Sequence, residues 1–338
     1  MYQTLYHTED ISKYAFLVTG GAGFIGSNLV EYLLKYGAGK VRVLDNLSSG
    51  FYKNIVEFVT NPAFEFINGD IRDLNTCKEA LEGIDYVLHH AALGSVPRSI
   101  NDPIATNETN VSGFLNMLVA VKDSGVKRMV YAASSSTYGD SKELPKLEDR
   151  IGKPLSPYAV TKLVNELYAD VFAKTYGIKA IGLRYFNVFG PNQDPGGAYA
   201  AVIPLFMQAL SDGKPALING DGTQTRDFTF IENVVQANMK ALLSKKEPAY
   251  PIYNVAFNAR ISLNELWDTL KSLAGTDPGV NFGPSRAGDI RDSHADISRI
   301  KDDLGYNPVF DLKQGLEITY NWLNKGRSNL KKHEYGND

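Results

Sequence analysis

One tyrosine and one lysine are spaced so that they could act together in proton transfer. Tyr158 and Lys162 are four residues apart and follow Ser156-Pro157, where a long helical pattern begins. Positions i and i+4 share a helix face, so the phenol and the ammonium group point the same way. The pKa of tyrosine is ordinarily about 10, and a nearby cation favours the phenolate. The pair therefore predicts a tyrosine base, although by itself the pattern also suits an ordinary surface helix.

A serine beside a predicted strand could complete this arrangement. Ser134 follows the predicted strand 128–132 and precedes Tyr158 by 24 residues. A hydroxyl group at the carboxyl end of a strand could bridge a substrate hydroxyl to the tyrosine. The alternative is a Ser/Thr-rich turn that only satisfies its own backbone. Together with the glycine motif described next, the order of these residues favours a catalytic set of Ser134, Tyr158 and Lys162.

A glycine motif near the start of the chain could bind a dinucleotide. Gly20, Gly23 and Gly26 lie between a predicted strand and a predicted helix. Such glycines allow a tight turn and a close approach of backbone N–H groups to a pyrophosphate, which the helix N-terminus also favours. Asp45 ends the next predicted strand, where a carboxylate binds the ribose 2′-hydroxyl and repels a 2′-phosphate. The motif predicts NAD rather than NADP; a glycine-rich turn without a ligand is the alternative.

The elements that must position these residues alternate along the first half of the chain. Their apolar runs are nearly continuous, as in strands buried on both faces of a parallel sheet. Alternating strands and helices with such a sheet predict a Rossmann-like, doubly wound α/β fold. The expected strands are 15–19, 41–45, 64–68, 86–90, 128–132 and 178–183, and the expected helices are 25–36, 77–82, 107–123 and 158–176.

The pattern changes after about residue 190. Gly190-Pro191 and the segment 194–197 form a turn-rich break, and less regular helices and short strands follow. We expect a smaller α/β lobe over the carboxyl edge of the sheet, where open α/β sheets bind ligands. The predicted organisation is an NAD-binding domain at 1–190 and a mainly substrate-binding lobe at 191–338, with some exchange of elements between them.

Composition excludes several classes of protein. The 338 residues are 43% hydrophobic and 22% charged with a net charge of −3, so no nucleic-acid partner is expected. A single cysteine predicts no intramolecular disulfide, and the lack of a His/Cys cluster with metal-ligand spacing predicts no metal site. No apolar run approaches the roughly 18 residues that span a membrane, and the first residues do not form a signal peptide. We therefore expect a cytoplasmic protein with no membrane partner.

Eight motifs along the chain carry a family resemblance. They are Thr19–Gly26, Asp45–Gly50, Gly69-Asp70-Ile71, His89–Arg98, Ser156-Pro157-Tyr158 with Lys162, Leu183–Asn187, Gly222 with Arg226-Asp227, and Arg286–Asp289. With them, residues of roughly 15–325 resemble the extended short-chain dehydrogenase/reductases that act on nucleotide sugars. Within this family the chain is similar to UDP-hexose 4-epimerases, in particular to the subgroup that prefers N-acetylated sugars.

The resemblance implies two sets of binding residues beside the catalytic set. The residues that would hold NAD are Gly20, Gly23, Phe24, Ile25, Gly26, Asp45, Asn46, Leu47, Ser48, Ser49, Gly50, Asp70, Ile71, His90, Ala91, Ala92, Asn110, Tyr158, Lys162 and Phe186. The residues that would hold the UDP-sugar are Gly94, Ser95, Ser134, Ser135, Ser136, Asn187, Ala201, Val202, Arg226, Arg286, Asp289 and Ser293. The two arginines also suit a diphosphate, which guanidinium groups bind in a forked geometry.

The residues after Ser134 indicate which reaction of the family is expected. Nucleotide-sugar 4,6-dehydratases have Asp-Glu in this stretch, and decarboxylating relatives have a glutamate. This chain has Ser135-Ser136, which cannot exchange protons at neutral pH. The resemblance therefore implies reversible C4 epimerisation of UDP-N-acetylglucosamine to UDP-N-acetylgalactosamine through a 4-keto sugar and bound NADH, feeding surface polysaccharide synthesis.

Alternatives remain for the substrate and the activity. UDP-uronic-acid or UDP-glucose 4-epimerase, a UDP-sugar dehydrogenase and a non-catalytic NAD-binding scaffold are the other interpretations. The resemblance places Ser293 at a wall position that tyrosine fills in enzymes restricted to unacetylated hexoses, so a small residue there favours an acetamido group. It also predicts a homodimer formed through the helices 107–123 and 158–176.

Overall fold

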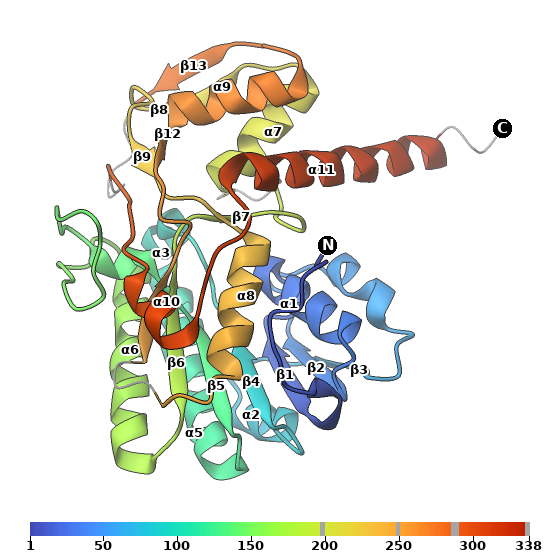
Figure 1. Ribbon diagram of the computed structural model, residues 1–338, viewed down its shortest axis with the longest axis vertical. Helices are drawn as coiled ribbons and strands as arrows, with labels where there is room; N and C mark the ends of the chain where they lie inside the picture. Colours follow the sequence, from blue (N-terminus) through green and yellow to red (C-terminus); the bar gives the residue numbers. More distant parts are fainter. Residues whose placement is uncertain (197–199, 248–250, 285–290, 335–338) are drawn as a thin grey trace.

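A seven-stranded parallel sheet forms the centre of the molecule (Figure 1). The computed structural model describes residues 1–196, 200–247, 251–284 and 291–334. The strand order is β3-β2-β1-β4-β5-β6-β11, and every neighbouring pair is parallel. The strands are β1 (Ala15–Thr19), β2 (Lys40–Asp45), β3 (Phe64–Asn68), β4 (Tyr86–His89), β5 (Arg128–Ser134), β6 (Ala180–Tyr185) and β11 (Ile252–Val255). The order reverses between β1 and β4, and the crevice at such a switch point is where this fold binds ligands.

Two layers of helices bury the two faces of the sheet. Along β1, Leu17 belongs to one apolar cluster, whereas Phe16 and Val18 belong to the other, because successive strand residues point to opposite faces. The first cluster is covered by α2 (Leu74–Ala80), α5 (Phe114–Ser124) and α6 (Pro157–Tyr176). The second is covered by α1 (Phe24–Lys35) and α8 (Ile231–Leu242). The predicted Rossmann-like α/β fold is therefore confirmed.

A smaller α/β region lies at one end of the sheet and contains most of the later elements (Figure 1). Its helices are α7 (Val202–Asp212) and α9 (Leu263–Ala274), and its short strands are β8 (Ala216–Asn219), β9 (Thr225–Arg226), β12 (Ile261–Ser262) and β13 (Val280–Gly283). A capping box begins α9, since Ser262 and Glu265 bond reciprocally there. Helix α10 (Ser298–Leu304) instead packs against β11 of the central sheet, where the Tyr253 hydroxyl donates to Asp303. The remaining elements are α11 (Leu312–Glu334) and the two-stranded pair β7 (Val188–Phe189) and β10 (Thr229–Phe230).

Several element boundaries differ from the predicted ones. The expected helix 107–123 is α4 (Pro103–Asn107), a π-helical turn (Glu108–Gly113) and α5 in succession. Helix α4 begins early because the Asp102 side chain accepts a hydrogen bond from the backbone N–H of Ala105 at 3.0 Å. Helix α2 begins at Leu74, not at residue 77, because Asp73 caps it. Five short elements of the structure were not predicted. They are the helix α3 (Val96–Asn101) and the four 3₁₀ turns at 11–13, 52–54, 56–58 and 135–138.

Two features of the described residues concern membrane-spanning helices and groups of metal ligands. None of their helices is both long and apolar enough to cross a membrane. None of their His, Cys, Asp and Glu side chains gather in a group of three or more that could hold a metal ion.

Candidate active site

The glycine motif forms a tight cradle between β1 and α1. Gly20 has φ +68°, and a Cβ atom there would lie 2.6 Å from the backbone nitrogen of Ala91. A Cβ atom at Gly26 would collide with the carbonyl oxygen of Gly20. Gly23 is the N-cap of α1 and provides no side-chain oxygen, so the first N–H groups of the helix stay open. A helix start without a capping side chain is suited to bind a phosphate.

A cavity of about 370 Å³ extends from this cradle to the predicted catalytic residues. It brings together most of the predicted NAD-binding residues, which come from the ends of β1 to β5 and from α6. Its wall contains Gly20, Gly23, Phe24, Ile25, Gly26, Asp45, Asn46, Ser48, Ser49, Gly50, Asp70, Ile71, His90, Ala91, Ala92, Gly94, Ser134, Tyr158 and Lys162. The cavity thus has the dinucleotide cradle at one end and the Tyr158 phenol at the other.

The carboxylate of Asp45 is fixed at the end of β2. Its two oxygens accept hydrogen bonds from the backbone N–H groups of Ala22, at 3.0 Å, and Leu47, at 2.8 Å. Burial raises the pKa of this carboxyl group, and both hydrogen bonds oppose that rise. Leu47, which has φ +58°, contributes its backbone N–H to Asp45. The side chain of Leu47 is not part of the cavity wall. Asp45 therefore lies where the prediction requires it, beside the glycine cradle.

The three predicted catalytic residues meet at the opposite end of the cavity. Tyr158 is in the first turn of α6, which starts after the N-cap Ser156. Burial raises the pKa of Tyr158, whereas a hydrogen bond with the Ser134 side chain lowers it. The Nζ atom of Lys162 lies 5.9 Å from the centre of the Tyr158 ring and donates to the carbonyl oxygen of Ala132 at 2.7 Å.

The electrostatics of this end differ from one expectation. Burial lowers the pKa of Lys162 to about 8, and Lys162 is not among the groups that lower the pKa of Tyr158. In the protein alone, desolvation therefore outweighs the lysine charge at the phenol. The geometry of the pair is as predicted, but a lowered pKa requires an additional cation in the cavity.

Two further predicted NAD residues lie outside the cavity wall. Asn110 is buried in the π-helical turn, where its side chain holds both the N–H and the C=O of Leu93, at 2.8 and 3.0 Å. Its amide nitrogen also donates to the hydroxyl of Thr161 on α6, at 3.2 Å. Phe186 is buried in the core, with its ring centre 5.9 Å from that of Tyr138. Neither side chain is part of the cavity wall, so both act at most through their neighbours.

His90 has a partner that the sequence did not indicate. Its Nε2 atom lies 2.9 Å from the hydroxyl of Tyr185, and the two rings are stacked with centres 5.9 Å apart. Burial lowers the pKa of His90 to about 3, so the imidazole is neutral at physiological pH. Tyr185, in the motif Leu183–Asn187, is also part of the cavity wall. Histidine at the end of β4 therefore contributes a neutral, packed surface to the cavity.

Two smaller cavities continue from this site into the C-terminal region. One, of about 140 Å³, contains the predicted substrate residues Ser134, Ser135, Ser136, Asn187, Arg226 and Ser293. The other, of about 220 Å³, contains Asn187, Ala201, Val202 and Arg226. Asn187 and Arg226 belong to both, and Ser134 joins the first to the dinucleotide cavity. The three spaces form one series from the glycine cradle to α7.

Asn187 organises the junction of the two smaller cavities. It has φ +37°, a conformation that Asn tolerates better than most residues. Its amide donates to the carbonyl oxygen of Asp227 at 3.0 Å and to the hydroxyl of Ser293 at 3.5 Å. Ser95, by contrast, is the N-cap of α3 and is not part of any of the three walls. Arg286 and Asp289 lie outside the described residues.

Sequence reasoning missed wall residues that are apolar or have ordinary polar side chains. In the 220 Å³ cavity these are Val188, Phe189, Gln193, Ala200, Ile203, Leu205, Phe206, Leu217, Asn219, Gln224, Phe228 and Leu263, and in the 140 Å³ cavity they are Val96, Gly139, Leu155, Ser156 and Ala159. They come from several helices, strands and loops that are distant in sequence, so their grouping depends on tertiary packing.

Comparison with known proteins decides the family. Residues 16–256 match the NAD dependent epimerase/dehydratase family. The chain belongs to this family. A UDP-glucose 4-epimerase of Mycolicibacterium smegmatis is 36% identical over 305 residues, which cover 90% of this chain and 96% of that protein.

Two solved structures show the same relationship in three dimensions. The UDP-N-acetylglucosamine 4-epimerase from Methanobrevibacter ruminantium, in complex with UDP-N-acetylmuramic acid, has a TM-score of 0.87 and 36% identity, and covers 93% of this chain and 99% of that one. The UDP-glucuronic acid 4-epimerase from Bacillus cereus, in complex with UDP-glucuronic acid and NAD, has a TM-score of 0.86 and 33% identity, and covers 92% and 99%. Relatives of similar identity thus act on three different sugars.

Proposed function

We propose that this NAD-dependent UDP-sugar 4-epimerase interconverts UDP-N-acetylglucosamine and UDP-N-acetylgalactosamine. The observation that carries the choice of sugar is Ser293, a small and buried residue whose hydroxyl lies 3.5 Å from the Asn187 amide. It shares the 140 Å³ cavity with Ser134, so a sugar in reach of Tyr158 would have Ser293 in its wall. A small residue leaves room for a 2-acetamido group, and hydroxyl and amide groups can bond to it.

NAD fits the residues that are present. The cradle is narrow enough that a Cβ atom at Gly20 or Gly26 would clash, its helix start is open, and Asp45 presents a carboxylate beside it. We propose that α1 holds the pyrophosphate, Asp45 holds the adenosine ribose, and the cavity end at Tyr158 holds the nicotinamide. Bound there, NAD would supply a reversible hydride acceptor for the sugar C4 atom.

Tyr158 is the proposed base and acid in this reaction. Its phenolate takes the proton of the sugar 4-hydroxyl, and the same oxygen later returns a proton to the 4-keto sugar. Ser134 contacts this phenol and would hold the reacting oxygen in place. Lys162 fixes the helix start and adds positive charge to the site. A cationic ring bound in the cavity would be the additional charge that favours the phenolate.

The described wall of the sugar cavity carries little charge. Among the described residues in the wall of the 140 Å³ cavity, Arg226 is the one cationic side chain. Arg226 also belongs to the 220 Å³ cavity beyond it, which suits the diphosphate and uridine. The described part of this wall contains no second cation to pair with a 6-carboxylate, and the assay below tests whether a hexuronic acid is converted.

The deciding experiment compares sugars without added NAD. Purified protein is incubated separately with UDP-N-acetylglucosamine, UDP-glucose and UDP-glucuronic acid, and the 4-epimers are separated by chromatography. We expect the fastest turnover with the acetylated sugar and no accumulation of NADH, because the reaction is redox-neutral. Fastest turnover of another sugar would reject the proposed specificity, and net NADH formation would indicate a dehydrogenase.

We also propose that two copies of the chain associate through the two predicted helical segments, which are α6 and the succession of α4, the π-helical turn and α5. Several large apolar side chains of these helices are exposed, namely Ile104, Val160, Leu167 and Val171. Such a patch favours a protein interface. Light scattering coupled to size-exclusion chromatography should give the mass of a dimer, and Leu167→Lys should shift it to that of a monomer. A monomeric mass for the wild-type protein would reject this dimer. The proposed division into an NAD-binding domain at 1–190 and a mainly substrate-binding lobe at 191–338 does not depend on the dimer.

A further inference from the structure

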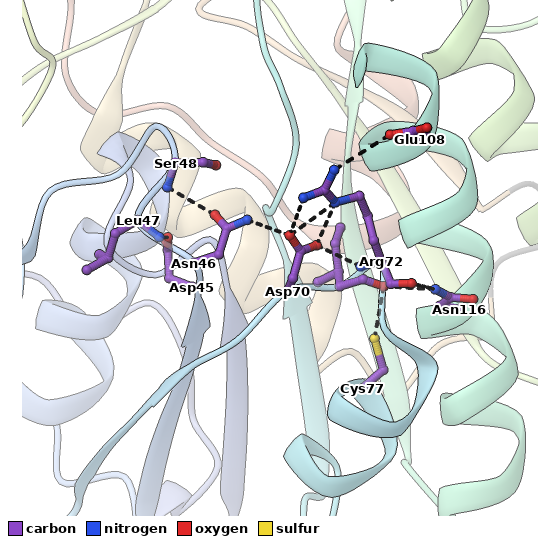
Figure 2. A network of polar contacts seen from close by, with 10 residues as sticks. Asp45, Asn46, Leu47, Ser48, Asp70, Arg72, Cys77, Glu108 and Asn116 are labelled. Carbon is purple, nitrogen blue, oxygen red and sulfur yellow. Dashed lines mark hydrogen bonds and ion pairs between the residues drawn. The ribbon is translucent and has the colours of Figure 1, made fainter. Parts of the chain in front are cut away.

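The carboxylate of Asp70 is held by a guanidinium fork at the end of β3 (Figure 2). The Nη2 and Nε atoms of Arg72 donate to its Oδ2 at 2.7 and 3.0 Å, and Nε also lies 3.1 Å from Oδ1. The backbone N–H of Arg72 donates to Oδ1 at 2.8 Å. The remaining donor is the Asn46 amide, at 2.8 Å from Oδ2. One residue, Arg72, therefore fixes both oxygens of Asp70.

The loop that carries this fork is itself tied to the helices beside it (Figure 2). The Nη1 atom of Arg72 lies 3.6 Å from a carboxylate oxygen of Glu108, in the π-helical turn. The Asn116 amide on α5 donates to the carbonyl oxygens of Ile71 and Arg72, at 3.0 and 2.8 Å. These contacts restrict both the backbone of the loop and the arginine side chain. They link the loop to the same turn that carries Asn110.

The position of Asp70 determines which part of a dinucleotide it would face. Strand β3 lies next to β2, and the backbone N–H of Gly69 donates to the carbonyl oxygen of Asp45 at 3.2 Å. Because Asp45 marks the adenosine ribose, the cavity wall beyond it, which contains Asp70, lies next to the base. An ionised carboxylate only accepts hydrogen bonds. The donor that adenine offers at its edge is the 6-amino group, since its ring nitrogens accept.

We propose that Arg72 is a positioning residue for cofactor selection, which holds the Asp70 carboxylate so that it reads the 6-amino group of adenine. This inference rests on the NAD dependence of the enzyme and not on which sugar it converts. Arg72 does not itself line the dinucleotide cavity, whereas Asp70 and Asn46 do. Asn46 is the one of the two donor residues that also lines the cavity, so its amide is the donor that would exchange for the ligand.

The fork provides two things that Asp70 alone lacks. It restricts the rotation of the carboxyl group, so less side-chain entropy is lost when the base binds. It also adds donors and positive charge at the carboxylate, which lower the pKa of Asp70 to about 2 and strengthen a charged form that already dominates at neutral pH. Lysine at this position would keep the charge but could not form the fork. The proposed role therefore depends on the shape of the guanidinium group as well as on its charge.

The experiment measures which dinucleotide the protein retains. Purified protein is equilibrated with mixtures of NAD and nicotinamide hypoxanthine dinucleotide, in which a carbonyl oxygen replaces the 6-amino group. Excess ligand is removed by rapid desalting, and the bound dinucleotides are released and quantified by chromatography. The variants are Arg72→Ala, Arg72→Lys and Glu108→Gln. The control is Arg150→Ala, because Arg150 forms a similarly exposed 3.6 Å pair with Glu143.

The wild-type protein should retain NAD about ten to a hundred times more strongly than the hypoxanthine analogue, as expected for one hydrogen bond to a charged group. Arg72→Ala and Arg72→Lys should reduce this ratio to about threefold or less, and Glu108→Gln should reduce it partially, while Arg150→Ala keeps the wild-type ratio. Circular dichroism and UDP affinity should stay at wild-type values in all variants. A general loss of structure would weaken the binding of both dinucleotides equally and leave their ratio unchanged. A change in the ratio therefore reports the position of Asp70 and not the stability of the fold.

Two results would overturn the inference. A wild-type ratio near one would show that no group reads the 6-amino position, and a wild-type ratio in Arg72→Ala would show that Asp70 needs no fork. If Arg72→Ala does not fold, Arg72→Lys decides by the same ratio. Failure of the sugar assay described above would leave this ratio unaffected, so the two proposals are tested separately.

Discussion

The ammonium group of Lys162 donates a 2.7 Å hydrogen bond to the carbonyl oxygen of Ala132, near the end of β5. This bond joins the first turns of α6 to the central sheet, immediately before Ser134. It explains how the tyrosine and the serine, which are distant in sequence, are held in contact at one end of the dinucleotide cavity. Lys162 is buried, so its orientation is set by this single strong donor contact and by packing.

Replacing the proposed base Tyr158 should reduce turnover and leave substrate affinity unchanged. Tyr158→Phe should reduce turnover by about two to four orders of magnitude, the usual contribution of a general acid–base group. UDP affinity, measured by calorimetry, should be nearly unchanged because only proton transfer needs the phenolic oxygen. Tyr176→Phe, on the exposed part of the same helix, is the control. Near-wild-type turnover of Tyr158→Phe would remove Tyr158 from the mechanism.

The choice of cofactor should depend on the carboxylate at the end of β2. Asp45→Ala removes both the proposed acceptor for the ribose 2′-hydroxyl and the charge that repels a 2′-phosphate. We expect NAD retention to fall and the preference for NAD over NADP to shrink by about tenfold or more. Bound dinucleotide released from purified protein provides the measurement. Wild-type protein that copurifies with NADP would show that the assignment of Asp45 is wrong.

A buried histidine should make the fold sensitive to acid. Burial lowers the pKa of His89 to about 3, from an ordinary value near 6.5. Between these values the unfolded chain binds a proton that the folded chain does not, so this contribution to stability is present above pH 6.5 and is lost as the pH falls. His89→Asn removes the titrating ring and keeps a polar atom for Thr19, whose hydroxyl lies 2.8 Å from Nδ1.

The measurement for His89 is urea denaturation at two pH values. Between pH 7.5 and pH 5, the free energy of unfolding of the wild-type protein should fall more than that of His89→Asn, by about 1–2 kcal/mol. The two proteins should show parallel behaviour above pH 7. An equal loss in both proteins at pH 5 would mean that His89 does not titrate in this range.

Sugar specificity should respond to the size of the residue at position 293. Ser293→Tyr places a ring in the 140 Å³ cavity, where Ser293 now lies beside Asn187. We expect loss of turnover with UDP-N-acetylglucosamine, while turnover with UDP-glucose is kept or improved. Ser293→Ala, which removes only the hydroxyl group, should keep the acetylated activity within about tenfold. Retention of acetylated-sugar turnover in Ser293→Tyr would reject the wall assignment.

Local sequence determined the elements that carry strong, short-range signals. The motif Gly20–Gly26 could be interpreted because only glycines permit its turn and its close contacts, and Asp45 followed from its position at the end of the next strand. The predicted bounds of β1 and β3 agree with the structure at both ends. A short, continuous apolar run between polar residues is typical of a buried strand. The proposed catalytic residues were predicted from their types and spacing.

The arrangement of the site depended on contacts between distant parts of the chain. Burial of Tyr158 raises its pKa, although spacing alone suggested that Lys162 would lower it, because desolvation is a property of the whole surrounding fold. The Asn187–Ser293 contact and the Arg72–Glu108 pair likewise join segments that no local pattern relates. Sequence therefore determined which chemical groups are available and where the chain turns. Only the tertiary structure decided their neighbours, because burial and charge act through space and not along the chain.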